Sequence, residues 1–303
     1  MSCFNPRIAF QAGLNENGKK HVKFARLRVD WSIKDYKLHY GDSIFLMPCG
    51  QCEGCKLEKA RDWATRCVLE AKYHSESCFL TLTYSDENLP SSLDEHKKNL
   101  NSFIDSLRNA GLKIRYFGCS ERGSRTKRLH AHVILFGWCP GDLELYSKGS
   151  NGDFLYTSKT LEKYWTKGFS IVGFMTFQSA GYVARYTLKK SGSDDESFIF
   201  MSIRPGIGFQ YLKDNAEIIV RYDSVYGEFG DSSTAPVPRY FNRFLSEWFP
   251  KEYEKLQAKR LRNITLHDNN ALINMRTGYL ELLKKSKEDD LLKRTASLER
   301  DNV

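Results

Sequence analysis

A short polar tip in the middle of the chain joins two stretches that have the composition of β-strands. Residues 113–119 and 130–137 are rich in apolar, β-branched and aromatic side chains, and an eight-residue tip at 122–129 separates them. Because so short a connection cannot hold a crossover helix, the two strands are predicted to pair as an antiparallel hairpin. Any fold for this chain has to accommodate that hairpin.

Helices and further strands surround the hairpin. Apolar residues at i, i+3 and i+4 predict amphipathic helices at residues 57–71 and 100–107, with Gly111 as the stop of the second. Apolar and β-branched stretches predict strands at residues 22–29, 43–46, 78–84 and 170–177. Ser179 is placed to cap a third helix. Strands connected partly by hairpins and partly by helices predict an α+β fold with a central, mainly antiparallel sheet flanked by helices.

Composition divides the chain into three parts. Residues 1–75 form an N-terminal segment with a CxxCxxC motif and the first helix, residues 76–233 form a core domain, and residues 234–303 combine a linker with a helical C-terminal region. The linker is predicted at residues 234–239, because two prolines in three positions favour an extended backbone.

His130 and His132 alternate with Ala131 at the start of the second hairpin strand. Side chains two residues apart point to the same face of a strand, so the two imidazoles can share one ion. The hairpin also places Glu121 close to opposite His130, where the Cβ atoms of paired residues lie about 4.5–5.5 Å apart. Two imidazoles and a carboxylate leave positions open for a phosphate oxygen and water, which suits Mg²⁺ or Mn²⁺ as a Lewis acid. The alternative is a histidine pair that only packs in a buried strand.

Tyr182 and Tyr186 are four residues apart on the third predicted helix. Residues at this spacing share a helix face and lie about 5–6 Å apart, so either phenol could reach the same phosphate. Tyrosine can form a covalent enzyme intermediate, and a phosphotyrosine bond keeps the energy of a broken phosphodiester, so that a strand could be resealed without ATP. The alternative is an aromatic stripe that packs the helix on the sheet.

Basic residues surround these motifs. The chain has 46 Lys and Arg against 37 Asp and Glu, and the resulting formal net charge of +9 favours a polyanionic partner. Candidate contacts to a nucleic-acid backbone are Arg122, Arg125, Lys127 and Arg128 on the hairpin tip, and Arg185 and Lys190 on the tyrosine helix. Lys189, one turn after Tyr186, could stabilise charge on a reacting phosphate. For the tip, the alternative is a solvated loop.

Three cysteines, Cys49, Cys52 and Cys55, precede the first helix at the spacing CxxCxxC. Three thiolates at this spacing resemble a zinc knuckle that needs a fourth ligand, and Cys3 is the candidate. A structural Zn²⁺ is therefore one interpretation. The first residues lack the basic start and apolar core of a signal peptide, and no stretch approaches the ~18 apolar residues that cross a bilayer. We therefore expect a cytoplasmic protein with no membrane partner, in which cysteines stay reduced.

The motifs occur in an order that resembles one known family. They are MSCFNP at the N-terminus, MPCGQCEGCKLEKARDWATRC, CFLTLTYSDENLP, YFGCSERGSRTKRLHAHVILFG, GYVARYTLKK and SIRPGIG, all within residues 1–210. Together they resemble the replication initiator (Rep) proteins of gokushovirus-type microviruses, small single-stranded DNA phages, within the HUH endonuclease superfamily.

This resemblance implies rolling-circle replication. It implies that His130 and His132 bind metal and that Tyr182 and Tyr186 alternate as nucleophiles. One tyrosine would nick single-stranded origin DNA and hold the 5′-phosphate, and the other would cut after one round so that the strand can be rejoined. The protein would work in the cytoplasm of the bacterial host, with the host polymerase extending the 3′-hydroxyl. A host helicase would unwind the duplex, because the chain carries no GxxxxGK[ST] motif.

Two other functions fit part of the pattern. A plasmid replication initiator or a mobilisation relaxase would use the same chemistry, although relaxases more often carry a third histidine near the pair, which is absent here. A non-enzymatic zinc and nucleic-acid-binding protein would use the cysteines and the basic residues, with the tyrosines in its core. A covalent protein–DNA adduct that depends on both tyrosines would separate these classes.

Overall fold

The computed structural model describes residues 3–4, 6–14, 20–26, 33–41, 44–123, 127–149, 152–186, 198–260, 262, 285 and 287–293. The chain forms two compact units. One comprises Met1–Glu58 and Lys251–Arg300, and the other comprises Lys59–Pro250 and Asp301–Val303.

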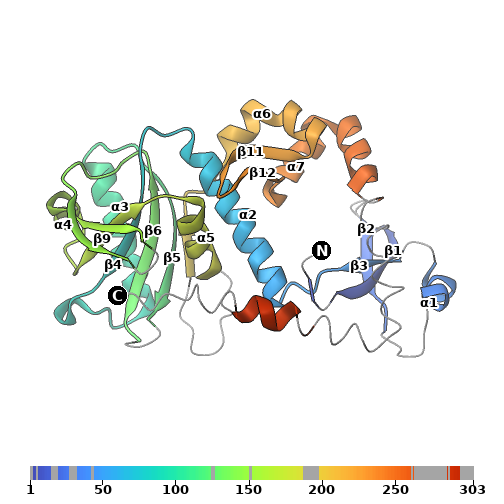
Figure 1. Cartoon of the computed structure of the whole chain (residues 1–303), viewed down its shortest axis with the longest axis horizontal. Helices are drawn as coiled ribbons and strands as arrows, with labels where there is room; N and C mark the ends of the chain where they lie inside the picture. The colour runs from blue at the N-terminus through green and yellow to red at the C-terminus, as the bar shows by residue number, and fades with distance from the viewer. Residues whose placement is uncertain are drawn as a thin grey trace. The chain divides into compact units, whose positions relative to one another are not determined.

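A seven-stranded sheet organises the larger unit (Figure 1). Its strands, in spatial order, are β10 (Phe198–Met201), β5 (Arg115–Arg122), β6 (Leu129–Phe136), β4 (Ser77–Thr83), β9 (Ser170–Phe174), β8 (Phe154–Thr157) and β7 (Glu144–Lys148). Every neighbouring pair is antiparallel. The α+β class with a mainly antiparallel sheet is therefore confirmed, and β5 and β6 form the predicted hairpin.

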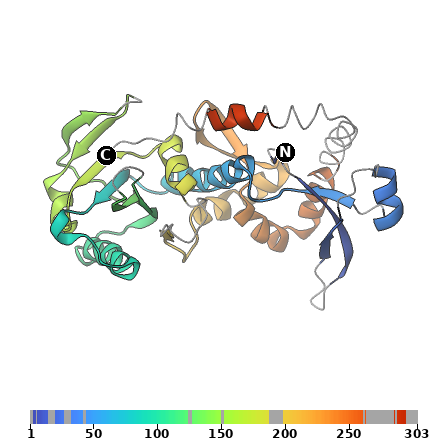
Figure 2. The same cartoon turned by 90° about the horizontal axis from the view of Figure 1, so that it is seen from below.

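Helices cover both faces of this sheet, as the two orthogonal views show (Figure 1 and Figure 2). On one face, α3 (Leu93–Asn109) packs through residues such as Leu107 against Leu80 and Val133. On the other face, α2 (Glu53–Ala71) and α5 (Phe177–Tyr186) pack against β5 and β6. Alternate residues of β6 face one core or the other, so the strand is apolar at nearly every position. His130 and His132 are the polar exceptions.

Helix α5 begins earlier than the sequence predicts, and Ser179 is not its cap. The helix starts at Phe177, and Thr176 Oγ1 accepts a hydrogen bond from the backbone N–H of Ser179 at 3.0 Å. Ser179 Oγ in turn accepts from the N–H of Thr176 at 2.8 Å. This reciprocal arrangement is that of a capping box with Ser179 three residues inside the helix. The strand expected over 170–177 accordingly ends at Phe174.

Several elements were not predicted from the sequence. They are β7, β8, α4 (Lys159–Tyr164), the 3-10 turn η1 (Asp86–Asn88), α6 (Phe209–Tyr222), β11 (Ser224–Phe229), β12 (Ser232–Pro236) and α7 (Arg239–Trp248). The predicted linker at 234–239 overlaps β12, which pairs with β11 and buries Ala235. A two-stranded hairpin accepts proline because its outer edge needs no N–H donor. Residues 250–260 and 287–293 are helical, as expected for the C-terminal region.

The smaller unit is built on a three-stranded antiparallel sheet. Its spatial order is β2 (Lys20–Phe24), β1 (Arg7–Leu14) and β3 (Ile44–Met47), and α1 (Ile33–Tyr40) lies between β2 and β3 in the chain. The hydrophobic cluster of this sheet has Ile8 and Tyr36 as its buried members. So small a core gives little stabilisation of its own.

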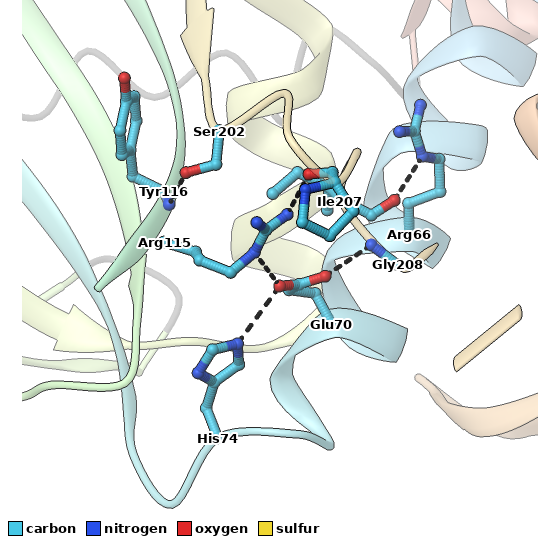
Figure 3. A network of polar contacts seen from close by, with 9 residues as sticks. Arg66, Glu70, His74, Arg115, Tyr116, Ser202, Ile207 and Gly208 are labelled. Atoms are coloured by element: carbon cyan, nitrogen blue, oxygen red, sulfur yellow. Dashed lines mark hydrogen bonds and ion pairs between the residues drawn. The ribbon is translucent and has the colours of Figure 1, made fainter. Parts of the chain in front are cut away.

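A buried carboxylate on α2 ties together three segments of the larger unit (Figure 3). Glu70 forms an ion pair with Arg115 of β5, and its other oxygen accepts a hydrogen bond from the N–H of Gly208 at 2.6 Å. His74 Nε2 lies 3.2 Å from the carboxylate. Arg115 also donates to the carbonyl of Pro205 at 2.6 Å. These contacts hold α2, β5 and the segment that leads into α6.

Gly168 lets the chain before β9 approach β4 closely. A Cβ atom at this position would lie 2.4 Å from the carbonyl oxygen of Thr83 and 2.5 Å from the backbone nitrogen of Ser85. Because both atoms belong to the backbone, they cannot move aside cheaply. We expect Gly168→Ala to lower the free energy of unfolding by about 1–3 kcal/mol, the usual cost of overpacking. Urea denaturation measures the change.

Gly141→Ala is the matched control, because a Cβ atom at Gly141 meets nothing within 4 Å. Equal unfolding free energies for the Gly168 and Gly141 variants would contradict the proposed close approach.

Among the helices that the structure describes, none combines the length and apolar composition that crossing a bilayer requires.

Candidate active site

The register of the β5–β6 hairpin brings the predicted metal ligands together. Glu121 pairs with His130, and Cys119 pairs with His132. Side chains of paired residues point to the same face, so Glu121, His130 and His132 share the face covered by α2 and α5. The ligand atoms of the three residues all lie within 4.8 Å of one another.

Both imidazoles present their Nε2 atom to one carboxylate oxygen. The distances to Glu121 Oε1 are 3.0 Å from His130 Nε2 and 3.3 Å from His132 Nε2. The opposite nitrogens are held from behind: His130 Nδ1 lies 3.3 Å from the carbonyl of Arg128, and His132 Nδ1 lies 3.1 Å from Thr81 Oγ1. A carbonyl can only accept, so His130 carries its proton on Nδ1 and leaves the Nε2 lone pair facing Glu121. This donor set fits a divalent cation held by two Nε2 atoms and a carboxylate.

Burial sets the charge states of these groups. Desolvation lowers the pKa of His132 below its usual value, against the opposing hydrogen bond of Glu121, so the imidazole stays neutral. Burial alone would raise the pKa of Glu121, but the hydrogen bonds of His130 and His132 outweigh it and hold the pKa below its usual value. A neutral imidazole and an ionised carboxylate are the forms that bind metal.

Tyr182 lies directly beside the histidines. Its ring centroid is 5.1 Å from that of His132, with the ring planes at 82°. Phe79 of β4 completes the group, because its ring stacks on His132 at 5.6 Å and meets Tyr182 edge-on at 6.3 Å. Helix α5 therefore delivers the first tyrosine to the metal-ligand face of the sheet, and Tyr182 is half-buried there.

The other predicted residues fall in several places. Tyr186 is the last residue of α5, and its side chain lies outside the described part of the chain, as do Arg125, Lys189 and Lys190 entirely. Arg185 is half-buried on α5. On the tip, Lys127 is exposed, and Arg122 donates to its carbonyl at 3.0 Å. Arg128 is held by an ion pair with Asp86 and by the carbonyl of Tyr84 at 2.8 Å.

The four cysteines also come together. The Sγ atoms of Cys3, Cys49, Cys52 and Cys55 lie within 4.8 Å of one another in the smaller unit.

Thr81 and Phe79 are site residues that sequence reasoning missed. Both face the histidines because β4 pairs with β6, with Thr81 directly opposite His132. The alternation Phe79-x-Thr81 shows that the two side chains share a face, but it does not show which strand lies beside them.

We expect Thr81→Val to weaken divalent-metal binding by about 10- to 100-fold, because second-shell partners of a metal-binding histidine have effects of this size. Isothermal titration with Mn²⁺ measures the affinity. Thr83→Val is the matched control on the same strand, since the Thr83 hydroxyl donates to the carbonyl of Phe169 at 2.9 Å instead. Equal affinities for the two variants would show that the Thr81 hydroxyl does not orient His132.

Comparisons with known proteins agree with this geometry. A family model for replication-associated proteins of the ORF2 type matches residues 77–191. The chain is 33% identical to replication-associated protein ORF2 of Spiroplasma virus 4, over 88% of each chain. It is 30% identical to replication-associated protein VP4 of Bdellovibrio phage phiMH2K, over 86% of this chain and 82% of the relative. It is also 30% identical to replication-associated protein ORF4 of Chlamydia phage 1, over 79% of this chain and 64% of the relative. No solved structure matches the chain.

Proposed function

The chain belongs to the gokushovirus-type replication-associated proteins of microviruses, and from that premise we propose that it is a metal-dependent nickase that initiates rolling-circle replication. The observation that carries the proposal is the position of Tyr182, whose ring lies 5.1 Å from that of His132. A nucleophile on the other face of the sheet could not use a metal held by the histidines.

The proposed reaction is a transesterification at a phosphodiester of single-stranded origin DNA. The phenol oxygen of Tyr182 or Tyr186 attacks phosphorus, a tyrosine O–P bond forms, and the bond from phosphorus to the 3′ oxygen breaks. The proton lost by the phenol is balanced by the proton gained at the 3′ oxygen. The tyrosine then holds the 5′-phosphate, and the free 3′-hydroxyl can prime synthesis by the host polymerase.

His130, His132 and Glu121 would hold a divalent cation, Mg²⁺ or Mn²⁺, which would supply Lewis-acid polarisation of the phosphate when bound. The chain's own residues orient the reactants. Thr81 and the carbonyl of Arg128 fix the two imidazoles, and α5 fixes Tyr182 beside them. Preorganised groups of this kind need little rearrangement when charge develops on the phosphate.

Rejoining requires a second nucleophile. After one round of replication, the other tyrosine of the pair would cut the regenerated origin, and the released 3′-hydroxyl would attack the first phosphotyrosine to close the strand. Tyr182 and Tyr186 are one helical turn apart on α5, which lets both serve one metal. The cations Arg122, Arg125, Lys127, Arg128, Arg185 and Lys190 would contact the DNA backbone, with Lys189 near the reacting phosphate. This work would take place in the bacterial cytoplasm with a host helicase.

A suicide assay tests the proposal. The protein is incubated with Mn²⁺ and single-stranded oligonucleotides that tile the phage genome, and a covalent protein–DNA adduct is sought on a denaturing gel. We expect an adduct with one origin sequence, and its loss when Tyr182 and Tyr186 are both replaced by Phe. Tyr222→Phe, at an exposed tyrosine of α6, is the control that should keep the adduct.

An adduct that persists in the double variant would refute the proposed nucleophiles. If no metal and no oligonucleotide gives an adduct, the alternative of a non-enzymatic nucleic-acid-binding protein is favoured.

A further inference from the structure

The four clustered cysteines have the geometry of a metal site that the nicking chemistry does not use. Cys49 Sγ lies 4.0 Å from Cys55 Sγ, and Cys52 Sγ lies 3.9 Å from Cys3 Sγ. A disulfide needs sulfur atoms about 2.0 Å apart, and all four residues are free cysteines. Four sulfurs at the corners of a tetrahedron around zinc, each about 2.3 Å from the ion, lie about 3.8 Å from one another. The observed separations match the tetrahedron.

Backbone N–H groups also point at these sulfurs. Cys3 Sγ accepts from the N–H of Cys49 at 3.2 Å, and Cys52 Sγ accepts from the N–H of Phe4 at 3.4 Å. Cys49 Sγ accepts from the N–H of Cys52 at 3.3 Å and from that of Gln51 at 3.5 Å. Donors directed at sulfur stabilise thiolates, which are the form that binds zinc.

We propose that Cys3, Cys49, Cys52 and Cys55 bind a structural Zn²⁺ that fastens the N-terminal segment to the start of α2. The small hydrophobic cluster around Ile8 and Tyr36 gives a physical reason for such a cross-link. Units that cannot build a sizeable core commonly depend on a metal for stability. The site has no open position for a substrate, because all four ligands come from the protein.

Metal analysis of the full chain tests the proposal. We expect wild-type protein, purified with Zn²⁺ and then dialysed, to keep one zinc ion per chain, and a protein carrying both Cys49→Ser and Cys52→Ser to lose it. Cys139→Ser is the matched control, at a half-buried cysteine outside the cluster. His130→Ala separates the two metal sites and should keep its zinc.

Cobalt substitution keeps the test valid if the double variant does not fold. Wild-type protein loaded with Co²⁺ should show intense thiolate-to-metal charge-transfer absorption and the visible d–d bands of a tetrahedral ion. Absence of these bands would overturn the proposal, and so would zinc that survives the double substitution.

A second inference rests on two exposed aromatic residues on the same sheet face as the histidines. Thr83 pairs with His130 across β4 and β6. On its other side, the N–H of Thr83 donates to the carbonyl of Phe169 at 2.9 Å, so the register of β4 with β9 extends to Phe169. Glu121, His130, Thr83 and Phe169 therefore form one row across the sheet. Neighbouring strands are about 4.8 Å apart, which puts Phe169 about 10 Å from His130.

The ring of Tyr146 on β7 extends this row. Its centroid lies 5.2 Å from that of Phe169, and the two side chains are 57% and 37% exposed. Exposed aromatic rings beside a basic surface are the usual platform for unpaired bases, because every base has a face that can stack. A few nucleotides of single-stranded DNA span the distance from the row's metal ligands to this pair.

The geometry points to Phe169 and Tyr146 as a stacking platform for a base of single-stranded DNA close to the nicked phosphate, an inference that rests on the proposed function. Gly168 supports the platform, since only glycine permits the chain to lie so close to Thr83 just before Phe169.

Binding without metal tests the platform separately from nicking. The affinity for a fluorescent oligo-dT is measured by anisotropy in EDTA for Phe169→Leu and Tyr146→Leu. Stacking on one aromatic side chain is worth about 1–3 kcal/mol, so we expect affinity to fall roughly 5- to 150-fold. Phe174→Leu is the matched control, because Phe174 is 59% exposed and pairs with Cys78, whose side chain lies in the core under α3.

Wild-type affinity in both platform variants, or an equal loss in the Phe174 control, would overturn the inference. A loss confined to the platform variants supports it even if no covalent adduct forms in any assay, so the two proposals can fail separately.

Discussion

Replacement of Glu70 by Gln is expected to lower the free energy of unfolding by about 3–5 kcal/mol, because removal of one partner leaves the other charge of a buried ion pair uncompensated. Glu70 is 5% exposed, and its carboxylate is the shared partner of Arg115, His74 and the N–H of Gly208. Gln keeps the size of the side chain, so the effect reports the charge and its hydrogen bonds rather than a cavity. Urea denaturation at neutral pH measures the loss.

The matched control is an ion pair in water. Asp94 has a side chain that is 93% exposed, and it lies 3.3 Å from Lys97 on α3. Exposed pairs contribute about 0–1 kcal/mol, so Asp94→Asn should leave the unfolding free energy almost unchanged. A Glu70→Gln protein as stable as the Asp94→Asn protein would show that the network in Figure 3 does not hold α2, β5 and the α6 segment together.

The same carboxylate predicts a dependence of stability on pH. Burial alone would raise the pKa of Glu70, but His74, the N–H of Gly208 and Arg115 together hold it below the ordinary value of 4.5. A pKa that is lower in the folded state stabilises the protein above the unfolded value, and this stabilisation is lost as pH falls through the folded value. We expect wild-type stability to decline below about pH 4.5 and the Glu70→Gln protein to decline less steeply over that range.

Local patterns in the sequence predict the core of the site. The short tip fixes the β5–β6 pairing, and the pairing fixes which residues face each other, so the match of Glu121 with His130 follows from sequence spacing alone. The CxxCxxC motif likewise places three cysteines at the start of α2 through local geometry. In each case the relevant residues are close in the chain, and the turn or helix between them has few conformations.

Contacts between distant segments could not be predicted in this way. Thr81 reaches His132 because β4 pairs with β6, and those residues are 51 positions apart. The pairing of β4 with β9, which puts Phe169 in the row of His130, depends on the same long-range packing. Strands β7 and β8 are short and exposed, so they lack the apolar periodicity that marks the central strands. Thr176 rather than Ser179 caps α5, because both hydroxyls suit the cap and only the end of β9 decides between them.

His130→Ala should reduce the rate of covalent adduct formation by about 10²- to 10⁴-fold, if the proposed nicking reaction is correct. A Lewis-acid metal contributes several kcal/mol to transition-state stabilisation, and about 1.4 kcal/mol corresponds to a factor of ten in rate. His130 is a better choice than His132 for this test, because its side chain is 17% exposed and that of His132 is 6% exposed. Loss of the more buried ring would also leave a cavity under Phe79 and Tyr182.

The rate is measured in single-turnover reactions with saturating oligonucleotide and Mn²⁺, so that weaker DNA binding does not contribute. His39→Ala, at an exposed histidine of α1 in the smaller unit, is the matched control and should react at the wild-type rate. Raising the Mn²⁺ concentration should restore part of the rate to the His130 variant, because His132 and Glu121 remain as ligands. A wild-type rate in the His130→Ala protein at limiting Mn²⁺ would mean that Tyr182 reacts without a metal on this face of the sheet, and the proposed mechanism would be wrong.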